Sequence, residues 1–96
     1  MPTFIALLKW TQQGAAKVKE SPKRLDLGRK AFQKMGVQIK DTYLTMGRYD
    51  LVCVIEGPDD ETVARALLSL GSLGNVQTET LKAFTEEEYR KITRSL

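Results

Sequence analysis

The order of the predicted elements indicates an α+β fold built on a four-stranded antiparallel sheet. Along the 96 residues, segments with the hydrophobic period of strands and of helices follow one another as β-α-β-β-α-β-α. Two of the strands are apolar throughout, whereas the other two carry polar and charged residues. Two right-handed split β-α-β units in this order put the apolar strands at the centre of the sheet and both crossover helices on one face. This arrangement is the ferredoxin-like plait.

Changes of hydrophobic period mark the first strand and the helices that follow it. Residues 3–10 are an apolar run of strand length, and residues 11–18 predict a short helical piece. Ser21 and Pro22 predict the cap and the first residue of a longer helix, because serine is a preferred N-cap and proline a preferred first helical residue. Gly36 predicts the end of that helix.

A hairpin is predicted in the middle of the chain. Residues 37–46 mix β-branched and aromatic side chains with polar ones, which is typical of an edge strand. Residues 49–56 are the most strand-like segment of the chain, and Gly47 and Arg48 predict a tight connection between the two strands.

The second half of the chain predicts a helix, a strand and a final helix. Acidic residues at 59–61 follow Gly57 and Pro58 and favour the positive end of a helix dipole. Residues 75–84 alternate as a fourth strand should. Thr85 and Glu88 have the spacing of a capping box, which predicts a C-terminal helix.

Composition excludes several classes of chemistry and favours a single domain over residues 1–96. Fifteen Lys and Arg against twelve Asp and Glu give a charge of +3, too small and too interspersed to indicate nucleic-acid binding. There is no histidine and one cysteine, so Ser-His and Cys-His triads, structural zinc, histidine-ligated haem and an intrachain disulfide are excluded. Helix capping accounts for the acidic residues at 59–61, so neither a metal nor a cofactor is expected.

The expected location is the cytoplasm, without membrane contact. No segment reaches the roughly 18–20 apolar residues that a membrane-spanning helix needs. The apolar start of the chain lacks the basic region and the cleavage pattern of a signal peptide. Cys53 lies in an apolar run, as a buried thiol does in a reducing compartment.

The two central strands are apolar at both parities, which predicts that both faces of the sheet are covered. Residues 4–8 and 51–55 are continuous apolar runs, whereas a strand covered on one face alternates. Two helices cover one face only, and a bare apolar face of this size exceeds what a monomer usually exposes. We therefore expect a homodimer, or a higher even oligomer, that packs on the second face. The alternative is a C-terminal helix that folds under the sheet and completes a monomer.

Polar and aromatic side chains gather at one edge of the predicted sheet. Antiparallel geometry brings the ends of the first and second strands to the starts of the third and fourth. An aromatic wall with a few polar groups suits a small-molecule pocket, and the candidate ligand-binding residues there are Lys9, Trp10, Thr11, Tyr43, Tyr49, Asp50 and Thr78. In the alternative interpretation Trp10 and Tyr49 pack against the core and Asp50 caps the hairpin turn.

Two functions follow from this edge. One is a homo-oligomer that binds a small molecule between or beside the packed sheets, which the absence of histidine and of a nucleophile–base pair favours. The other is a cofactor-free isomerase or monooxygenase for a small carbonyl or aromatic compound, in which Asp50, Tyr43 or Lys9 transfers a proton. RNA binding on the open sheet lacks the stacking aromatic residues that such sheets present.

Four ordered motifs resemble the GYD domain family, and the resemblance spans essentially the whole chain. In this sequence the motifs are Lys9-Trp10-Thr11, the run from Tyr43 to Asp50, the run from Glu56 to Asp60, and the run from Gly74 to Thr80 with Ala83-Phe84-Thr85. Arg48 separates Gly47 from Tyr49-Asp50, so the glycine–tyrosine–aspartate signature is not contiguous. The resemblance implies a small bacterial or archaeal cytoplasmic protein with the architecture of a dimeric α/β barrel, and it transfers no reaction.

Overall fold

Four strands form one antiparallel sheet in the computed structural model, which describes residues 1–96. The strands are β1 (Thr3–Trp10), β2 (Gln38–Leu44), β3 (Leu51–Glu56) and β4 (Val76–Ala83). Their order in the sheet is β2-β3-β1-β4, so the two apolar strands are central, as predicted. The helices are α1 (Gln12–Ala16), the 3-10 helix η1 (Val18–Glu20), α2 (Ser21–Lys34), α3 (Asp60–Ser72) and α4 (Glu86–Arg94).

Local signals set most helix ends, with one difference at the start of α2. Ser21 was predicted as the N-cap, but its backbone is already helical and Glu20 is the N-cap. The prediction is wrong by one residue because η1 runs directly into α2 and leaves no extended residue between them. The predicted glycine at the end of α2 is confirmed: Gly36 has a φ of +80°, in the left-handed region that glycine adopts without a Cβ clash.

The connection between β2 and β3 is longer than the sequence predicted. The strands end at Leu44 and begin at Leu51, so six residues separate them instead of Gly47 and Arg48 alone. Thr45 and Asp50 are still joined by a backbone hydrogen bond of 2.9 Å. Asp50 leaves the hairpin ladder beyond that bond, because its own N–H donates to the carbonyl of Leu8 on β1.

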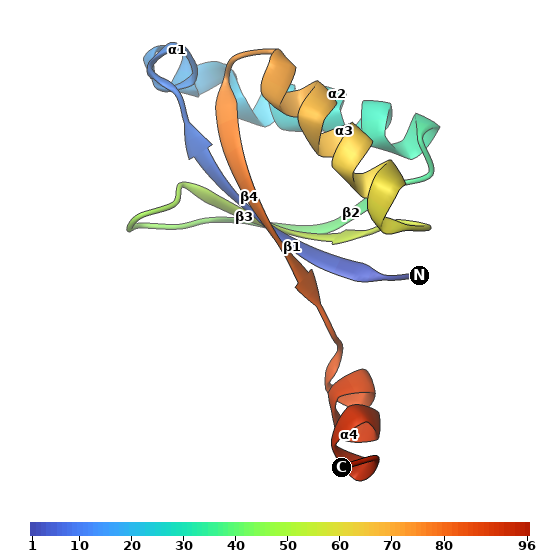
Figure 1. Ribbon diagram of the computed structural model, residues 1–96. Coiled ribbons are helices and arrows are strands. Elements are labelled where there is room, and N and C mark those ends of the chain that lie inside the picture. The colour runs from blue at the N-terminus through green and yellow to red at the C-terminus, as the bar shows by residue number, and fades with distance from the viewer.

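The hydrophobic core lies between the sheet and the two long helices. Figure 1 shows α2 and α3 on the same side of the sheet. Phe4, Ala6 and Leu8 alternate along β1 toward this side, as the period of two in a strand requires. The buried residues of the core are Phe4, Ala6, Leu8, Phe32, Val37, Cys53, Ile55, Val63, Ala66, Leu67 and Val76.

The opposite face of the sheet carries the remaining apolar residues of the central strands. Ile5 and Leu7 on β1 pair with Val54 and Val52 on β3, and all four are half-buried. Leu81 on β4 pairs with Ile5 and is exposed. We call the surface formed by Ile5, Leu7, Val52, Val54 and Leu81 the open face.

The C-terminal helix does not cover the open face. In Figure 1, α4 lies beyond the end of β4, away from the sheet and from the other helices. The alternative in which this helix folds under the sheet therefore does not occur in this structure, and the open face has no intrachain cover. None of the helices combines the length and apolar character needed to span a membrane.

Candidate functional site

Trp10, Thr11 and Asp50 lie together where β1 ends. The backbone N–H of Trp10 donates to Asp50 Oδ2 at 2.9 Å, so the carboxylate closes the end of the β1 ladder. Thr11 Oγ1 donates to the carbonyl of Gly74 at 2.6 Å and accepts from the N–H of Gly14 as the N-cap of α1. The Asp50 side chain therefore bonds to the end of β1, whereas the hairpin turn is closed by the backbone bond from Thr45 to Asp50. The indole N–H of Trp10 is buried without a hydrogen-bond acceptor.

Tyr49 turns toward the other edge of the sheet. Its hydroxyl donates to Glu79 Oε1 on β4 at 2.7 Å. Glu79 pairs with Leu7, a residue of the open face, so Tyr49 links the β2–β3 loop to β4 across β1. The hydrogen bond to the Glu79 carboxylate raises the pKa of Tyr49 above its ordinary value, because the phenolate is repelled by the carboxylate. Tyr49 is therefore a weaker acid here than a free tyrosine.

The other predicted residues are divided between the two sides of the sheet. Tyr43 pairs with Val52, which puts it on the side of the open face at the β2 edge, where it is exposed. Lys9 follows Ile5 and Leu7 at the strand period on that same side and is exposed. Thr78 pairs with Leu8 and lies on the helix side. No hydrogen bond joins Asp50, Tyr43 and Lys9 to one another, and ligand binding by the predicted set stays a prediction.

An open groove of about 440 Å³ lies between α3 and β4. Val63, Ala64, Leu67 and Leu68 form its helix wall, whereas Phe4, Thr78 and Thr80 form its sheet side. Lys82 and Asp60 close one end, since Lys82 Nζ donates to Asp60 Oδ1 at 2.9 Å. Leu68, on the helix wall, is 75% exposed. We call this surface the α3–β4 groove.

The sequence-based prediction did not include most of this groove. Val63 and Leu67 recur at helical spacing in the sequence, and both are buried in the core. Leu68 is the one signal that was available, because it is a large apolar residue outside the stripe of Val63, Ala66, Leu67 and Leu70. Glu79, the partner of Tyr49, had no signal in the sequence, since the pairing depends on the conformation of the β2–β3 loop.

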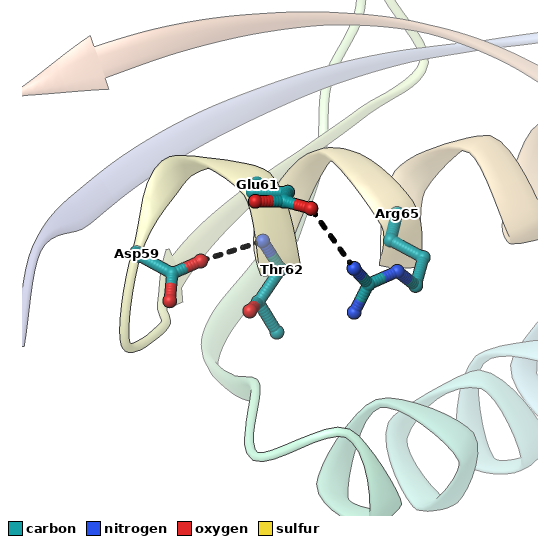
Figure 2. Close-up of polar contacts among 4 residues, drawn as sticks. All are labelled: Asp59, Glu61, Thr62 and Arg65. Carbon is teal, nitrogen blue, oxygen red and sulfur yellow. Dashed lines mark hydrogen bonds and ion pairs between the residues drawn. The ribbon is translucent and has the colours of Figure 1, made fainter.

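Acidic residues at the start of α3 stabilise the helix through a cap and an ion pair. Figure 2 shows that Asp59 is the N-cap and accepts from the N–H of Thr62 at 2.7 Å, while Glu61 pairs with Arg65 at 3.3 Å one turn later. The bond from the Thr62 N–H holds the pKa of Asp59 below its usual value. The capping role predicted for this segment is confirmed for Asp59.

Cys53 is buried on the core side of β3. Its sulfur lies 3.4 Å from Thr42 Oγ1. Burial raises the pKa of the Cys53 thiol, which keeps it in the unreactive neutral form.

The fold and these surfaces define a class of protein: a ferredoxin-like α+β domain whose sheet has an uncovered apolar face. A match to the model of one family makes the identification specific. The GYD domain model matches residues 4–93, so the chain belongs to the GYD domain family.

This chain is also similar to three known proteins, of which MtbAldR shares the fold alone. A protein of Thermus thermophilus described as a glutamine synthetase and cystathionine beta-lyase binding protein is 42% identical over 84 residues, which is 86% of this chain and 88% of that protein. A crystal structure of another Thermus thermophilus protein has a TM-score of 0.56 at 25% identity and covers 88% of this chain and 95% of its own. The crystal structure of MtbAldR has a TM-score of 0.69 at 13% identity over 88% of this chain, which spans about half (52%) of that protein.

Proposed function

We propose that residues 1–96 act as one GYD domain in a cytoplasmic homodimer that binds other proteins, metabolic enzymes in particular. The observation that carries the dimer is the open face: Ile5, Leu7, Val52 and Val54 are aligned across two central strands with nothing of the same chain over them. Apolar residues in such a patch are buried in most soluble proteins. In a two-fold symmetric dimer, the open face of each copy packs on the open face of the other, so both are buried.

Enzyme binding is supported by the relative from Thermus thermophilus. That protein is described as binding glutamine synthetase and cystathionine beta-lyase, and its match extends over most of both chains. With the open face occupied by a second copy, the α3–β4 groove is the apolar depression that stays accessible. Its exposed Leu68 and its Lys82–Asp60 pair give an apolar centre with a polar end, as protein interfaces have.

The binding test uses purified glutamine synthetase and cystathionine β-lyase of Thermus thermophilus as probes. Calorimetry or biolayer interferometry is expected to detect binding of at least one of them. Leu68→Asp should weaken that binding by about tenfold, which corresponds to about 1.4 kcal/mol, because it puts a charge into the apolar part of the proposed interface. Leu27→Asp is the matched control, since Leu27 is an exposed leucine on α2 (58% exposed) outside the groove. Binding of neither enzyme, or equal losses in both variants, contradicts the proposal.

The dimer is tested separately by native mass spectrometry and light scattering. The wild-type chain and Leu27→Asp are expected to be dimers or larger even assemblies at micromolar concentration. Leu7→Asp and Val54→Lys should be folded monomers, because each puts a charge into the centre of the proposed interface. A monomeric wild-type chain would overturn the assembly.

A small-molecule ligand between or beside the sheets is a second candidate function, and one observation favours it. The buried Trp10 indole N–H has no acceptor, and a buried donor is usually satisfied by a partner. A ligand with a carbonyl or carboxylate oxygen would supply that partner. An added mass on the native protein that disappears in Trp10→Phe supports this candidate, and an unmodified mass in both contradicts it.

The cofactor-free enzyme is the weaker alternative on this geometry. No hydrogen bond joins Asp50, Tyr43 and Lys9 to one another, and the Asp50 carboxylate bonds to the backbone N–H of Trp10, so these residues do not form an acid–base pair. The enzyme alternative would be supported if the protein showed isomerase or monooxygenase activity and Asp50→Asn abolished that activity without unfolding the protein.

A further inference from the structure

Helix α4 is separate from the rest of the fold. All its hydrogen bonds and its ion pair are local: the Thr85–Glu88 capping box and the Glu86–Arg90 pair at 2.7 Å lie within residues 85–96. No hydrogen bond or ion pair connects these residues to the body of the protein. Figure 1 shows the helix at the far end of β4, with open space around it.

A helix of this length does not hold its structure by local interactions. It has nine residues, whereas isolated helices shorter than about 12–15 residues are marginal in water even for favourable sequences. Capping and one exposed ion pair add too little to change that. Most helical stability in proteins comes from packing an apolar face, so α4 needs a surface to pack on.

Such a face is present on α4. Tyr89 and Ile92 are three residues apart, which puts them on one side of the helix, and Leu96 follows two residues beyond its end. They are 61%, 46% and 98% exposed, while Glu87, Lys91 and Arg94 occupy the opposite side. The amphipathic pattern is therefore complete, and its apolar half has no intrachain partner.

Apolar residues continue along the sequence from the open face to α4. Leu81 belongs to the open face through its pairing with Ile5, and the exposed Phe84 follows β4 just before α4. We call the exposed apolar residues from Leu81 to Leu96 the C-terminal strip, and Figure 1 shows α4 beyond the sheet on the side opposite α2 and α3. A protein that packs on the open face is therefore the one that these apolar residues would contact.

We infer that α4 is an exchanged arm, which packs Tyr89, Ile92 and Leu96 against a second copy of this chain. The inference rests on the proposed dimer, because the second copy is the occupant of the open face. The C-terminal strip follows directly on the open face, so the same partner is expected to cover both. A second copy does this, whereas an enzyme bound at α4 alone would leave the sheet uncovered. Two-fold symmetry makes the exchange reciprocal, so each protomer receives one arm.

The test uses dimers mixed from ¹⁴N- and ¹⁵N-labelled chains, with hybrid dimers first identified by native mass spectrometry. Amine-directed cross-linking then reports the neighbours of Lys91, the lysine on α4. Links from Lys91 to lysines on the side of the open face, such as Lys9 and Lys40, are expected in hybrid ¹⁴N–¹⁵N pairs. Links in same-isotope pairs only would mean that α4 folds back on its own chain, and would overturn the inference.

Hydrogen exchange supplies a second measurement with a matched pair of variants. Ile92→Gln removes the apolar face, whereas Arg94→Gln puts the same side chain on the opposite side of α4. Amides of residues 89–94 are expected to exchange about tenfold faster in Ile92→Gln and nearly unchanged in Arg94→Gln. Unprotected α4 amides in a wild-type dimer would overturn the arm and leave the dimer intact. A monomeric wild-type chain would instead overturn the proposed dimer and the arm with it.

Discussion

Asp50 makes three hydrogen bonds, two of which join the β2–β3 loop to β1. Its N–H donates to the Leu8 carbonyl at 2.8 Å, its carboxylate accepts from the Trp10 N–H at 2.9 Å, and its carbonyl accepts from the Thr45 N–H at 2.9 Å. The first and third contacts need only a backbone, but the second needs an acceptor on the side chain. The Asp50 carboxylate therefore satisfies the Trp10 N–H, for which the Asp50 backbone supplies no acceptor.

Asp50→Ala is expected to lower the free energy of unfolding by about 1–2 kcal/mol, because the Trp10 N–H loses a charged acceptor. Asp50→Asn keeps an acceptor oxygen and should lose less than half of that. Urea denaturation of the three proteins at pH 7 measures both differences. Equal stability of Asp50→Ala and wild type would contradict the capping role.

Gly14 is required by a close approach of two chain segments. A Cβ at this position would overlap the carbonyl oxygen of Asn75, whose position is held by a hydrogen bond from the Thr11 N–H at 3.1 Å. Gly14→Ala is therefore expected to destabilise the protein by about 1–3 kcal/mol, as overpacking does. Gly28→Ala is the control: it lies within α2 with open space around it, and should stabilise by about 0.5–1 kcal/mol. Thermal unfolding of both variants and of the wild type measures these differences, and an unchanged stability of Gly14→Ala would contradict the close approach.

At the scale of elements, helix caps decide where α3 and α4 begin. Asp59 and Thr85 each accept from the N–H three residues later, which satisfies a donor that a helix start leaves free. In α4 the Glu88 carboxylate also accepts from the Thr85 N–H, and this bond holds the pKa of Glu88 below its usual value. Both carboxylates must be ionised for their caps to be at full strength.

This requirement predicts a loss of stability in acid. A pKa that is lower in the folded chain than in the unfolded chain stabilises the fold above the ordinary carboxyl pKa, and this contribution is lost as the pH falls through the lowered value. Asp59→Asn keeps a capping oxygen that does not titrate, so its unfolding midpoint in urea should fall less than that of wild type between pH 5 and pH 2. Glu61→Gln removes an acid from the same turn without removing the cap, and its midpoint should fall as steeply as that of wild type.

The whole molecule is asymmetric about its sheet, with two helices on one side and an uncovered apolar face on the other. The free energy that stabilises such a chain depends on what covers that face. A dimer makes this contribution dependent on protein concentration, because dissociation accompanies unfolding.

The midpoint of thermal unfolding is therefore expected to rise by about 5–10 °C when the protein concentration is raised a hundredfold. Leu7→Asp should unfold at a lower temperature that does not depend on concentration. Calorimetry of both proteins over that range provides the measurement. A wild-type midpoint independent of concentration would contradict the dimer.

Much of the fold was predictable because its signals are local. The strand period of residues 3–10 and the capping box at Thr85 and Glu88 depend on neighbours within a few residues, and both are confirmed. The β2–β3 connection was not predictable, because its conformation depends on the bond from Asp50 to Leu8 on another strand. The structure brings only part of the candidate site together. The backbone N–H of Trp10 bonds to the Asp50 carboxylate, whereas Thr78 lies on the helix side and Tyr43 on the side of the open face.

The sequence by itself determined which strands are central and that both of their faces are apolar, because side-chain alternation follows directly from the residue order. It also predicted a C-terminal helix from the capping box at Thr85 and Glu88, but not that Tyr89 and Ile92 share one apolar side of it. Only the tertiary structure decided that this side is left without an intrachain partner. The reason is that an amphipathic pattern specifies which face is buried but not against what, and the direction in which β4 leaves the sheet carries α4 away from its own chain.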